Sequence, residues 1–388
     1  MSVLSSKNLI GEIYRSNKEN PGFAVQKFTR LLVSGILKNN VKVKALSTPP
    51  IRPKWGKWVK PQTELENEIT YHYAPFINIP IIKHICVFLY TFFYILNWGI
   101  KHKKENVVLC DALTLSMSIG ALFASKLSGI KIVGVVTDLL GLIVGGKTFK
   151  NMIASKIYSR YIALFDSYIL LTEQMNEVVN PKKKPYIIME ALCDIDLNHK
   201  DQVNIPKDIP RVVMYAGGIY EQYGLKLLAE AFVLADIEDA KLVYYGSGPY
   251  VQEYKELCKM HSNLEYAGVA PNQEVVNAEL RATLLVNPRF SAEEFTKYSF
   301  PSKNMEFMVS GTPVLTTRLP GMPKEYLPYV FIFEKETLDG FADTLKKVMS
   351  YSSEKLDTIG ANAKRFVLDN KNNIDQGKRI VDFVFSIL

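Results

Sequence analysis

The chain has 388 residues, of which 48% are hydrophobic and 22% are charged, and this composition excludes wholesale disorder. A chain of this length exceeds one comfortable hydrophobic core, so we expect two domains of similar size. The formal net charge of +8 favours anionic partners such as nucleotides or anionic lipid headgroups. We expect no nucleic-acid partner, because the longest basic run, residues 182–184, lies between two prolines and is typical of a solvated loop.

Strand-like and helix-like segments alternate through the first half of the chain. The expected strands are residues 41–47, 107–111, 132–138 and 167–172. The expected helices between them are residues 25–39, 115–127 and 155–165. Alternation of this kind predicts a parallel sheet with helices on both faces, so the fold class is α/β. Asp111 and Asp138 end two of the strands, which places them at the carboxyl edge of the sheet, where ligands bind.

The most apolar segment is residues 79–104, which is rich in Ile, Leu, Phe and Tyr and ends in a basic Lys-His-Lys-Lys run. Lys83 and His84 interrupt it, so its uninterrupted part is too short to span a bilayer comfortably. Two interpretations stay open: a core helix that leads into the next strand, and an interfacial helix whose basic end meets anionic headgroups. Residues 1–15 contain no apolar run of signal-peptide length, so we expect a cytoplasmic protein, peripheral on the inner face of the cell membrane.

The second half of the chain repeats the same plan. Its expected strands are residues 211–218, 241–246, 264–268, 283–287 and 313–317, with helices such as 225–234 and 249–260 between them. A polar stretch separates the halves, so we expect a first domain of residues 1–199 and a second of residues 200–373. A last helix, residues 374–388, is expected to pack back on the first domain. Two doubly wound domains that face each other create a central cleft at the carboxyl ends of their strands.

Residues 298–317 predict a loop, a helix and a strand, beginning Tyr-Ser-Phe-Pro-Ser-Lys-Asn-Met-Glu and continuing through Gly-Thr-Pro-Val. Ser299 or Ser302 is expected to cap the helix, because both residue types accept hydrogen bonds from the first helical N–H groups. Pro301 is tolerated in the first turn, and Gly311 is a suitable helix stop.

Charged residues in this region favour an anionic ligand. Lys303 lies in the first helical turn, where the helix dipole disfavours a cation unless an anion is nearby, and Glu306 shares its face. Helix amides and an ammonium suit a phosphate, and a carboxylate one turn deeper can accept two hydroxyl hydrogen bonds. The apolar neighbours of Glu306 predict that its carboxylate is buried and needs such partners. We therefore predict a nucleoside-diphosphate clamp with Glu306 on the ribose, against the alternative of a simple Lys303–Glu306 ion pair. Arg289, after an apolar strand, either faces the ligand or pairs with Glu293 or Glu294.

Three further features have a structural and a functional interpretation. The turn at residues 245–248 is either a tight strand-to-helix connection or a ligand contact through Gly246. Asp194 and Asp196 have the spacing of a metal-binding Asp-x-Asp, but they lie at the domain boundary rather than after a clear strand, so we expect no metal. The four cysteines lack paired spacing, which is typical of buried, reduced thiols rather than disulfides or zinc ligands.

The second half resembles the family 4 glycosyltransferases, retaining enzymes of the GT-B fold, and in particular bacterial polysaccharide transferases with a Phe-Pro-Ser-Lys element. The resemblance covers residues 212–321 well and the first domain only loosely. It rests on Val-Asn-Pro-Arg at 286–289, Phe-Pro-Ser-Lys at 300–303 and Ser-Gly-Thr-Pro-Val at 310–314. It implies two Rossmann-like domains, with Glu306 holding the nucleotide ribose and the helix start, Pro301 to Lys303, contacting the diphosphate.

The chain departs from the family pattern at several positions. Tyr298 stands where the family has a second glutamate, which holds the donor sugar. The family's Gly-Arg and Lys-Gly pairs, after the first strand of this domain, appear here as Gly217-Gly218 and as a tyrosine followed by glycine. Both expected cations are therefore missing, and we infer that Arg289 and Lys303 replace them.

The resemblance assigns the acceptor to the first domain. The loop that contains Gly22 is similar to the family's first glycine-containing loop, which approaches the diphosphate from the opposite side. Asp138 lies where the family often keeps a histidine, and we hypothesise that Asp138 positions the acceptor hydroxyl. The resemblance implies that no protein nucleophile is needed, since a phosphate oxygen helps to deprotonate the acceptor on the face that the diphosphate leaves.

The sequence therefore predicts a retaining glycosyltransferase that moves a hexose from a nucleotide-diphosphate sugar, with UDP as the expected nucleotide, to a glycan or lipid-linked glycan in bacterial polysaccharide synthesis. The nucleotide sugar is a substrate, and no cofactor is predicted. Two alternatives stay open. One is a non-catalytic glycosyltransferase-like subunit, because the usual cations are missing. The other is a sugar-nucleotide epimerase or hydrolase of the same fold, for which the sequence offers no convincing acid/base set.

Overall fold

The structure is a computed structural model that describes residues 1–17, 23–52, 58–60, 62–102, 106–139, 157–196 and 205–388. The chain divides into two compact units. The first comprises Met1–Leu192 together with Asn373–Leu388, and the second comprises Cys193–Asn372. The sequence had placed the division after residue 199, in a stretch that lies partly outside the described residues.

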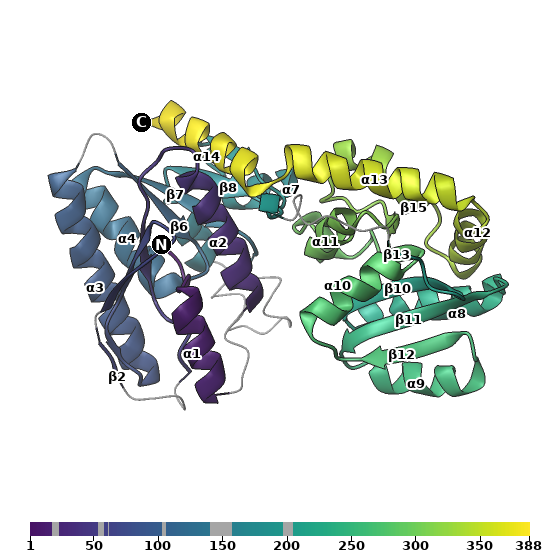
Figure 1. Cartoon of the computed structure of the whole chain (residues 1–388). Coiled ribbons are helices and arrows are strands. Elements are labelled where there is room, and N and C mark those ends of the chain that lie inside the picture. The colour runs from purple at the N-terminus through teal and green to yellow at the C-terminus, as the bar shows by residue number, and fades with distance from the viewer. Residues whose placement is uncertain (18–22, 53–57, 61, 103–105, 140–156, 197–204) are drawn as a thin grey trace. The chain divides into compact units, whose positions relative to one another are not determined.

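The first unit contains most of its elements before residue 192 (Figure 1). In chain order they are α1 (Lys7–Asn17), α2 (Phe23–Leu37), β1 (Lys44–Ser47), β2 (Trp58–Val59), β3 (Gln62–Glu66), β4 (Ile69–Tyr73), β5 (Phe76–Ile77), α3 (Pro80–Lys101), β6 (Val107–Asp111), α4 (Leu115–Ser128), β7 (Lys131–Val136), β8 (Ser167–Leu170), α7 (Glu173–Val179), β9 (Tyr186–Ile188) and, from the end of the chain, α14 (Asn373–Ile387).

Two sheets of the first unit are joined through the first residues of the chain. One is a parallel sheet in the order β6-β7-β8-β9, and the other has the order β1-β4-β3. The N–H of Ser2 donates to the carbonyl of Leu46 in β1, and the N–H of Asp111 in β6 donates to the carbonyl of Met1. The antiparallel β3–β4 hairpin was not predicted, because its turn uses Asn67 and Glu68 in left-handed conformations and has no glycine to indicate it.

Helices cover both faces of the parallel sheet of the first unit. Apolar side chains of α2 and α14 pack with those of β7 and β8 in one core cluster. On the other face α4 contacts β6 and β7, and α3 packs on the outside of α4. Glycines allow α2 and α14 to approach closely: a Cβ on Gly35 would lie 1.8 Å from the carbonyl oxygen of Asn373. The last helix therefore completes the core of the first unit.

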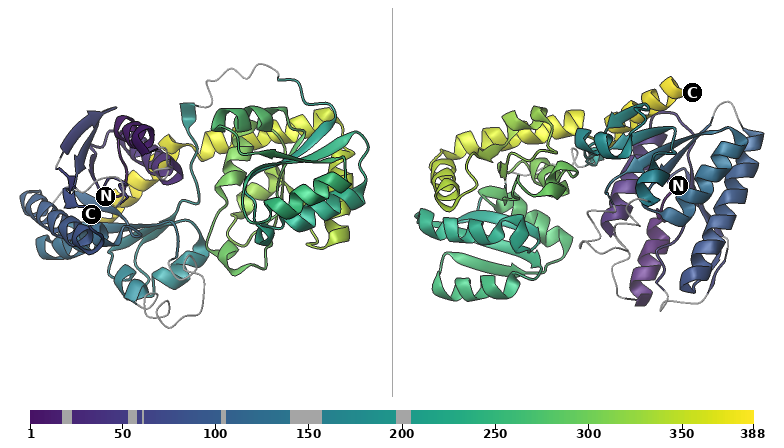
Figure 2. Two further views of the ribbon diagram at one scale, coloured as in Figure 1. Left: turned by 90° about the horizontal axis from the view of Figure 1, so that it is seen from below. Right: turned by 180° about the vertical axis from the view of Figure 1, so that it is seen from behind.

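The second unit is a doubly wound domain (Figure 2). In chain order its elements are β10 (Arg211–Gly218), η3 (Glu221–Tyr223), α8 (Leu225–Ala235), β11 (Ala240–Ser247), α9 (Val251–Met260), β12 (Leu264–Gly268), α10 (Asn272–Arg281), β13 (Leu284–Asn287), η4 (Glu294–Lys297), α11 (Ser302–Ser310), β14 (Val314–Thr317), η5 (Lys324–Tyr329), β15 (Phe331–Phe333), α12 (Leu338–Met349) and α13 (Ser353–Asn370).

The six strands that the structure describes in this unit are all parallel, in the order β12-β11-β10-β13-β14-β15. Side chains of α8, α9 and α12 form the main core cluster on one face of the sheet. Because parallel crossovers are right-handed and the strand order reverses after β12, α10 and α11 belong to the other face. The five strands predicted for this half are present within a residue of the predicted bounds, and only β15 was not predicted.

Candidate functional site

The strand order of the second unit reverses between β10 and β13. The chain builds β11 and β12 on one side of β10, then returns to place β13 on its other side. The loops that follow β10 and β13 therefore diverge at the carboxyl edge of the sheet, and ligands of open α/β sheets bind at such a point. Gly217 and Gly218 end β10, and Arg289 follows β13 by two residues.

Glycines let backbone segments pack closely at this edge of the sheet. A Cβ on Gly246, where φ is 130°, would lie 1.8 Å from the carbonyl oxygen of Gly217. A Cβ on Gly224, where φ is 77°, would lie 2.1 Å from the carbonyl oxygen of Pro288. Close packing thus explains the turn at residues 245–248 structurally, and a ligand contact through Gly246 stays a prediction.

Arg289 is a cation held by aromatic rings rather than by a carboxylate. Its guanidinium carbon lies 4.4 Å from the ring centre of Tyr223 and 5.9 Å from that of Phe295. Its buried Nε has no hydrogen-bond partner. Among the described residues no ion pair involves this side chain, so the alternative pairing with Glu293 or Glu294 is not formed. An unneutralised guanidinium at a ligand-binding edge is a suitable partner for a phosphate.

The positive charge of Arg289 also reaches Tyr215, the buried tyrosine in the middle of β10. Burial raises the pKa of Tyr215, and the nearby guanidinium of Arg289 opposes that rise. The hydroxyl of Tyr215 donates to the carbonyl of Gly218 at 2.9 Å, and the hydroxyl of Thr317 donates to the carbonyl of Arg289. The end of β10 is therefore fixed by a hydrogen bond from its own strand, and the loop after β13 by one from the neighbouring strand β14.

The helix α11 begins at this same edge, but not with the cap that the sequence predicts. Its N-cap is Pro301, which has no side chain to accept a hydrogen bond, so the prediction of Ser299 or Ser302 as the cap is wrong. The hydroxyl of Ser299 instead donates to the carbonyl of Phe295, and Ser302 is already the first helical residue. The first turn of α11 contains no acidic residue. The N–H groups of Ser302 and Lys303 precede any intrahelical acceptor and can serve an anion.

Lys303 and Glu306 form an ion pair. The Lys303 Nζ lies 2.7 Å from the Glu306 Oε2, and the two side chains are 29% and 37% exposed. Glu306 is therefore only partly buried, although its apolar sequence neighbours predicted a buried carboxylate. The helix turns Met305, Phe307 and Met308 into the core and leaves Glu306 on the outward face. A half-exposed pair contributes about 0–1 kcal/mol, so a ligand can displace it at small cost.

A buried polar network that the sequence did not predict fixes the start of α11. The Nδ2 of Asn287 donates to the Oδ1 of Asn304 at 2.6 Å, and the Nδ2 of Asn304 donates to the Thr316 hydroxyl at 3.4 Å. That hydroxyl donates to the carbonyl of Asn287 at 3.0 Å. The network ties α11 to the ends of β13 and β14. An asparagine on the apolar face of the predicted helix was the sequence signal for it.

The remaining predicted site residues lie elsewhere. Tyr298 is half-buried at the end of η4, on the approach to α11. Gly22 lies outside the described residues.

Asp138 belongs to the first unit, where it follows β7 and is exposed to solvent. Partial burial and the negative charge of Asp111 raise the pKa of Asp138. The Asp111 carboxylate accepts hydrogen bonds from the Leu113 N–H and the Thr114 hydroxyl, both at 2.9 Å, and so fixes its own loop.

The two aspartates of the Asp194-x-Asp196 motif are linked to each other by a hydrogen bond. The N–H of Asp196 donates to the Oδ1 of Asp194 at 3.1 Å. Within the ranges that the structure describes, no three His, Cys, Asp or Glu side chains converge as metal ligands. The four cysteines are free thiols, of which Cys110 and Cys193 are buried and Cys86 and Cys258 are partly exposed.

We expect replacement of Asn304 by alanine to lower the free energy of unfolding by about 1–3 kcal/mol, because the buried amide of Asn287 loses its acceptor. Urea unfolding followed by circular dichroism measures this loss. The matched control is Asn277→Ala on the exposed face of α10, for which we expect a change within about 0.5 kcal/mol. Equal unfolding midpoints for the two variants would contradict the structural role of the network.

Comparisons with known proteins identify the fold and a family match. Residues 197–366 match the family model described as "Glycosyl transferases group 1". A search of curated proteins returns no match to the chain.

Solved structures resemble the chain over most of its length at low sequence identity. The sucrose-phosphate synthase from Thermosynechococcus elongatus has a TM-score of 0.65 and 13% identity over 94% of each chain. HepE from Anabaena in complex with UDP has a TM-score of 0.60 and 13% identity, over 82% of this chain and 86% of that one. The lipopolysaccharide outer core galactosyltransferase WaaB has a TM-score of 0.58 and 18% identity, over 83% and 85%. The chain therefore has the GT-B fold, and its residues 197–366 match the glycosyltransferase group 1 model.

Proposed function

We propose that the protein is a retaining glycosyltransferase that transfers a hexose from a UDP-sugar to a glycan or lipid-linked glycan in bacterial polysaccharide synthesis. The observation that carries the proposal is the unneutralised guanidinium of Arg289 at the strand-order reversal of a glycosyltransferase group 1 domain. The first turn of α11 has no acidic residue, and Asn304 links this helix to the end of β13. The start of α11 therefore provides a second place where an anion can bind.

The chemistry of the transfer requires positive charge at this edge. As the glycosyl–phosphate bond breaks, negative charge grows on the leaving diphosphate, and fixed donors aimed at it lower the barrier by several kcal/mol in total. In the proposal, Arg289 and the amides of Ser302 and Lys303 receive the diphosphate. Glu306 then exchanges its ion pair for the ribose hydroxyls, which frees the Lys303 ammonium for a phosphate oxygen.

Backbone and aromatic groups complete the proposed donor site. In the proposal the backbone of Gly217, Gly218 and Gly246 faces the diphosphate, because these residues carry no side chain of their own at the strand ends. The ring of Tyr220 lies beside Gly218. Tyr298 takes the place of the family's second glutamate beside the donor sugar. Pro301 fixes the chain direction into α11. The proposal invokes no metal or other cofactor.

The acceptor is assigned to the first unit. We propose that Asp138 positions the acceptor hydroxyl while a phosphate oxygen of the donor takes its proton, and that the loop of Gly22 contributes to the diphosphate site. HepE structures contain UDP and UDP-glucose, and these ligands support UDP as the nucleotide. The likeness to a lipopolysaccharide galactosyltransferase supports a glycan acceptor. Such acceptors place the enzyme on the cytoplasmic face of the cell membrane.

The proposal is tested by screening UDP-, GDP- and ADP-sugars for thermal stabilisation, since a ligand that binds the native state raises the melting temperature. We expect a UDP-sugar to give the largest shift, followed by release of UDP in the presence of acceptor. The absence of stabilisation by any UDP-sugar would contradict the proposal.

The second candidate is a non-catalytic subunit that binds the donor. The ion pair between Lys303 and Glu306 favours it, because the two side chains neutralise each other without a ligand. Slow hydrolysis of the stabilising nucleotide sugar separates the two candidates. An enzyme releases UDP, whereas a binding subunit is stabilised and releases none.

Replacing Arg289 by leucine should lower kcat/KM by about 10²–10³, because a donor aimed at the developing phosphate charge is lost. Steady-state release of UDP measures the change. Arg365→Leu, on the exposed face of α13, is the matched control and should keep full activity. A tenfold or smaller loss in Arg289→Leu would argue against its role.

Glu306 is tested through the ligand rather than through activity alone. If its carboxylate binds the ribose, the wild-type protein should bind UDP about tenfold more tightly than 2′-deoxy-UDP, since a hydrogen bond to a charged group is lost. In Glu306→Ala the two affinities, measured by calorimetry, should become equal. Glu294→Ala, a neighbouring exposed glutamate, should keep the tenfold ratio.

Asp138 should affect turnover but not donor binding. Asp138→Asn is expected to lower kcat by about 10²-fold or more, while UDP binding stays unchanged. Because the pKa of Asp138 is raised, its working carboxylate is lost as the pH falls through that raised value. The acidic limb of the wild-type pH–rate profile should therefore lie above the usual aspartate range. Turnover of Asp138→Asn within a few-fold of wild type would exclude this role.

A further inference from the structure

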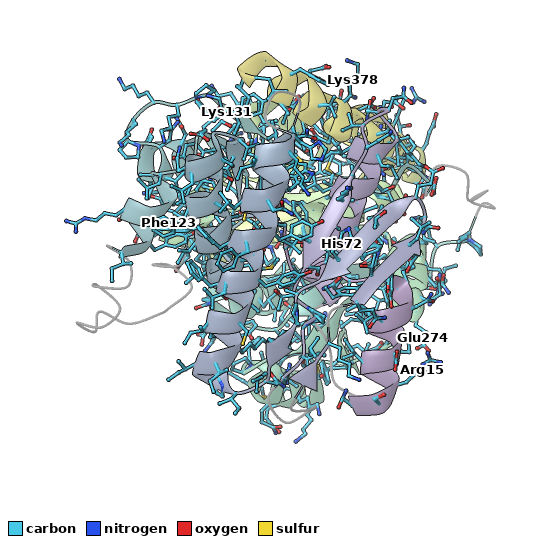
Figure 3. The ribbon with its side chains drawn as sticks, turned by 90° about the vertical axis from the view of Figure 1, so that its left-hand side faces the viewer. Arg15, His72, Phe123, Lys131, Glu274 and Lys378 are labelled. Atoms are coloured by element: carbon cyan, nitrogen blue, oxygen red, sulfur yellow. The ribbon has the colours of Figure 1, made fainter. Side chains whose placement is uncertain are left out.

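Helices α3 and α4 of the first unit expose a continuous set of large apolar side chains, called here the α3–α4 face. Its members are Ile81, Ile85, Leu89 and Phe93 on α3 and Phe123 and Leu127 on α4. Phe93 is 62% exposed and Leu127 is 70% exposed. Figure 3 looks onto this side of the molecule, with α3 toward the viewer and Phe123 labelled.

The outward face of α3 departs from the ordinary pattern of a surface helix. Val87, Thr91, Ile95 and Gly99, four residues apart, are its buried positions. A surface helix normally carries polar residues opposite such a stripe, but α3 carries Ile, Leu and Phe there. Its 22 residues contain an 18-residue window with a mean hydropathy of 1.4, and only 17% of that window is buried.

By length and composition α3 could cross a membrane, but its packing opposes a crossing. A Cβ on Gly120 of α4 would lie 2.7 Å from the carbonyl oxygen of Phe88, and a Cβ on Gly99 would lie 2.4 Å from the Ser128 hydroxyl. These two contacts fix α3 to α4 near the middle and near the end of both helices. To span a bilayer, α3 would have to leave α4 entirely. An apolar helix held along its length lies in the plane of an interface instead.

The exposed charges at the end of this face are mainly basic, since Asp166, which lies beside Lys131, is paired with Lys126 of α4 and accepts from the Ile132 N–H. The sequence contains no Asp or Glu between Glu68 and Glu105, and none in α4. Lys101 and His102 are exposed at the end of α3, and Lys131, labelled in Figure 3, is exposed just after α4. The contact between Gly99 and Ser128 brings these two ends together. The exposed Lys101 and Lys131 at this end complement anionic headgroups. The same two like charges disfavour contact with this end of a second copy.

We propose that the α3–α4 face docks flat on an anionic lipid bilayer, with Phe93, Phe123 and Leu127 in the boundary between headgroups and acyl chains. The basic end holds the anionic headgroups, and the apolar side chains supply the contact that persists when salt screens the charges. The surface shares no residue with the proposed donor site of the second unit, so docking and donor binding can fail separately.

The test is flotation of the full chain with vesicles of phosphatidylcholine alone and with vesicles that also contain phosphatidylglycerol. We expect the wild type to float with the anionic vesicles, and Phe93→Glu to lower the bound fraction about tenfold. The matched control is Phe385→Glu on α14, because Phe385 is 64% exposed and the change in charge is the same. Leu127→Glu tests the same face from α4 and should behave like Phe93→Glu.

Several results would overturn the proposal. They are the absence of wild-type flotation with either vesicle, equal losses in Phe93→Glu and Phe385→Glu, and sedimentation showing a dimer that Phe93→Glu dissociates. In the last case the face would be an interface between copies. Melting temperatures and UDP-sugar stabilisation, measured on the same samples, show that each variant is folded and that its donor site is unaffected.

Discussion

The adjacency of β10 and β13 is the constraint on which the second unit depends. The chain makes two further strands before it returns to the neighbour of β10, so the loops at this point separate and open the edge of the sheet. Backbone contacts hold the edge together, since Gly246 lies against Gly217 and Gly224 against Pro288. Any side chain at Gly246 or Gly224 would break these contacts, so both positions require glycine.

The electrostatics of the edge follow from how each cation is supported. Aromatic rings hold Arg289 in position without neutralising it, because a ring face attracts a guanidinium but carries no net charge. Lys303 is neutralised by Glu306 in a weak, half-exposed pair. One positive charge is therefore always available to an anion, whereas the other becomes available only when a ligand gives Glu306 a different partner.

Much of the fold could be predicted from the sequence, because buried parallel strands appear as short apolar runs between helical patterns, and all five strands predicted for the second half are present. The β3–β4 hairpin was missed because its strand β3 is polar and its turn has no glycine. The N-cap of α11 was predicted wrongly, because a serine near a helix start does not by itself determine which residue begins the helix. The aromatic support of Arg289 depends on Tyr223, which is distant in sequence, so local patterns contain no sign of it.

The position of α14 has a consequence for synthesis of the chain. Ile380 and Val381 pack with Leu32, Ile36 and residues of β7 and β8, so the first unit lacks part of its core until residues 373–388 leave the ribosome. The second unit is contiguous in sequence and can fold earlier. During synthesis the first unit therefore keeps apolar surface exposed after the second unit has folded. Chaperones should matter most for this part of the chain.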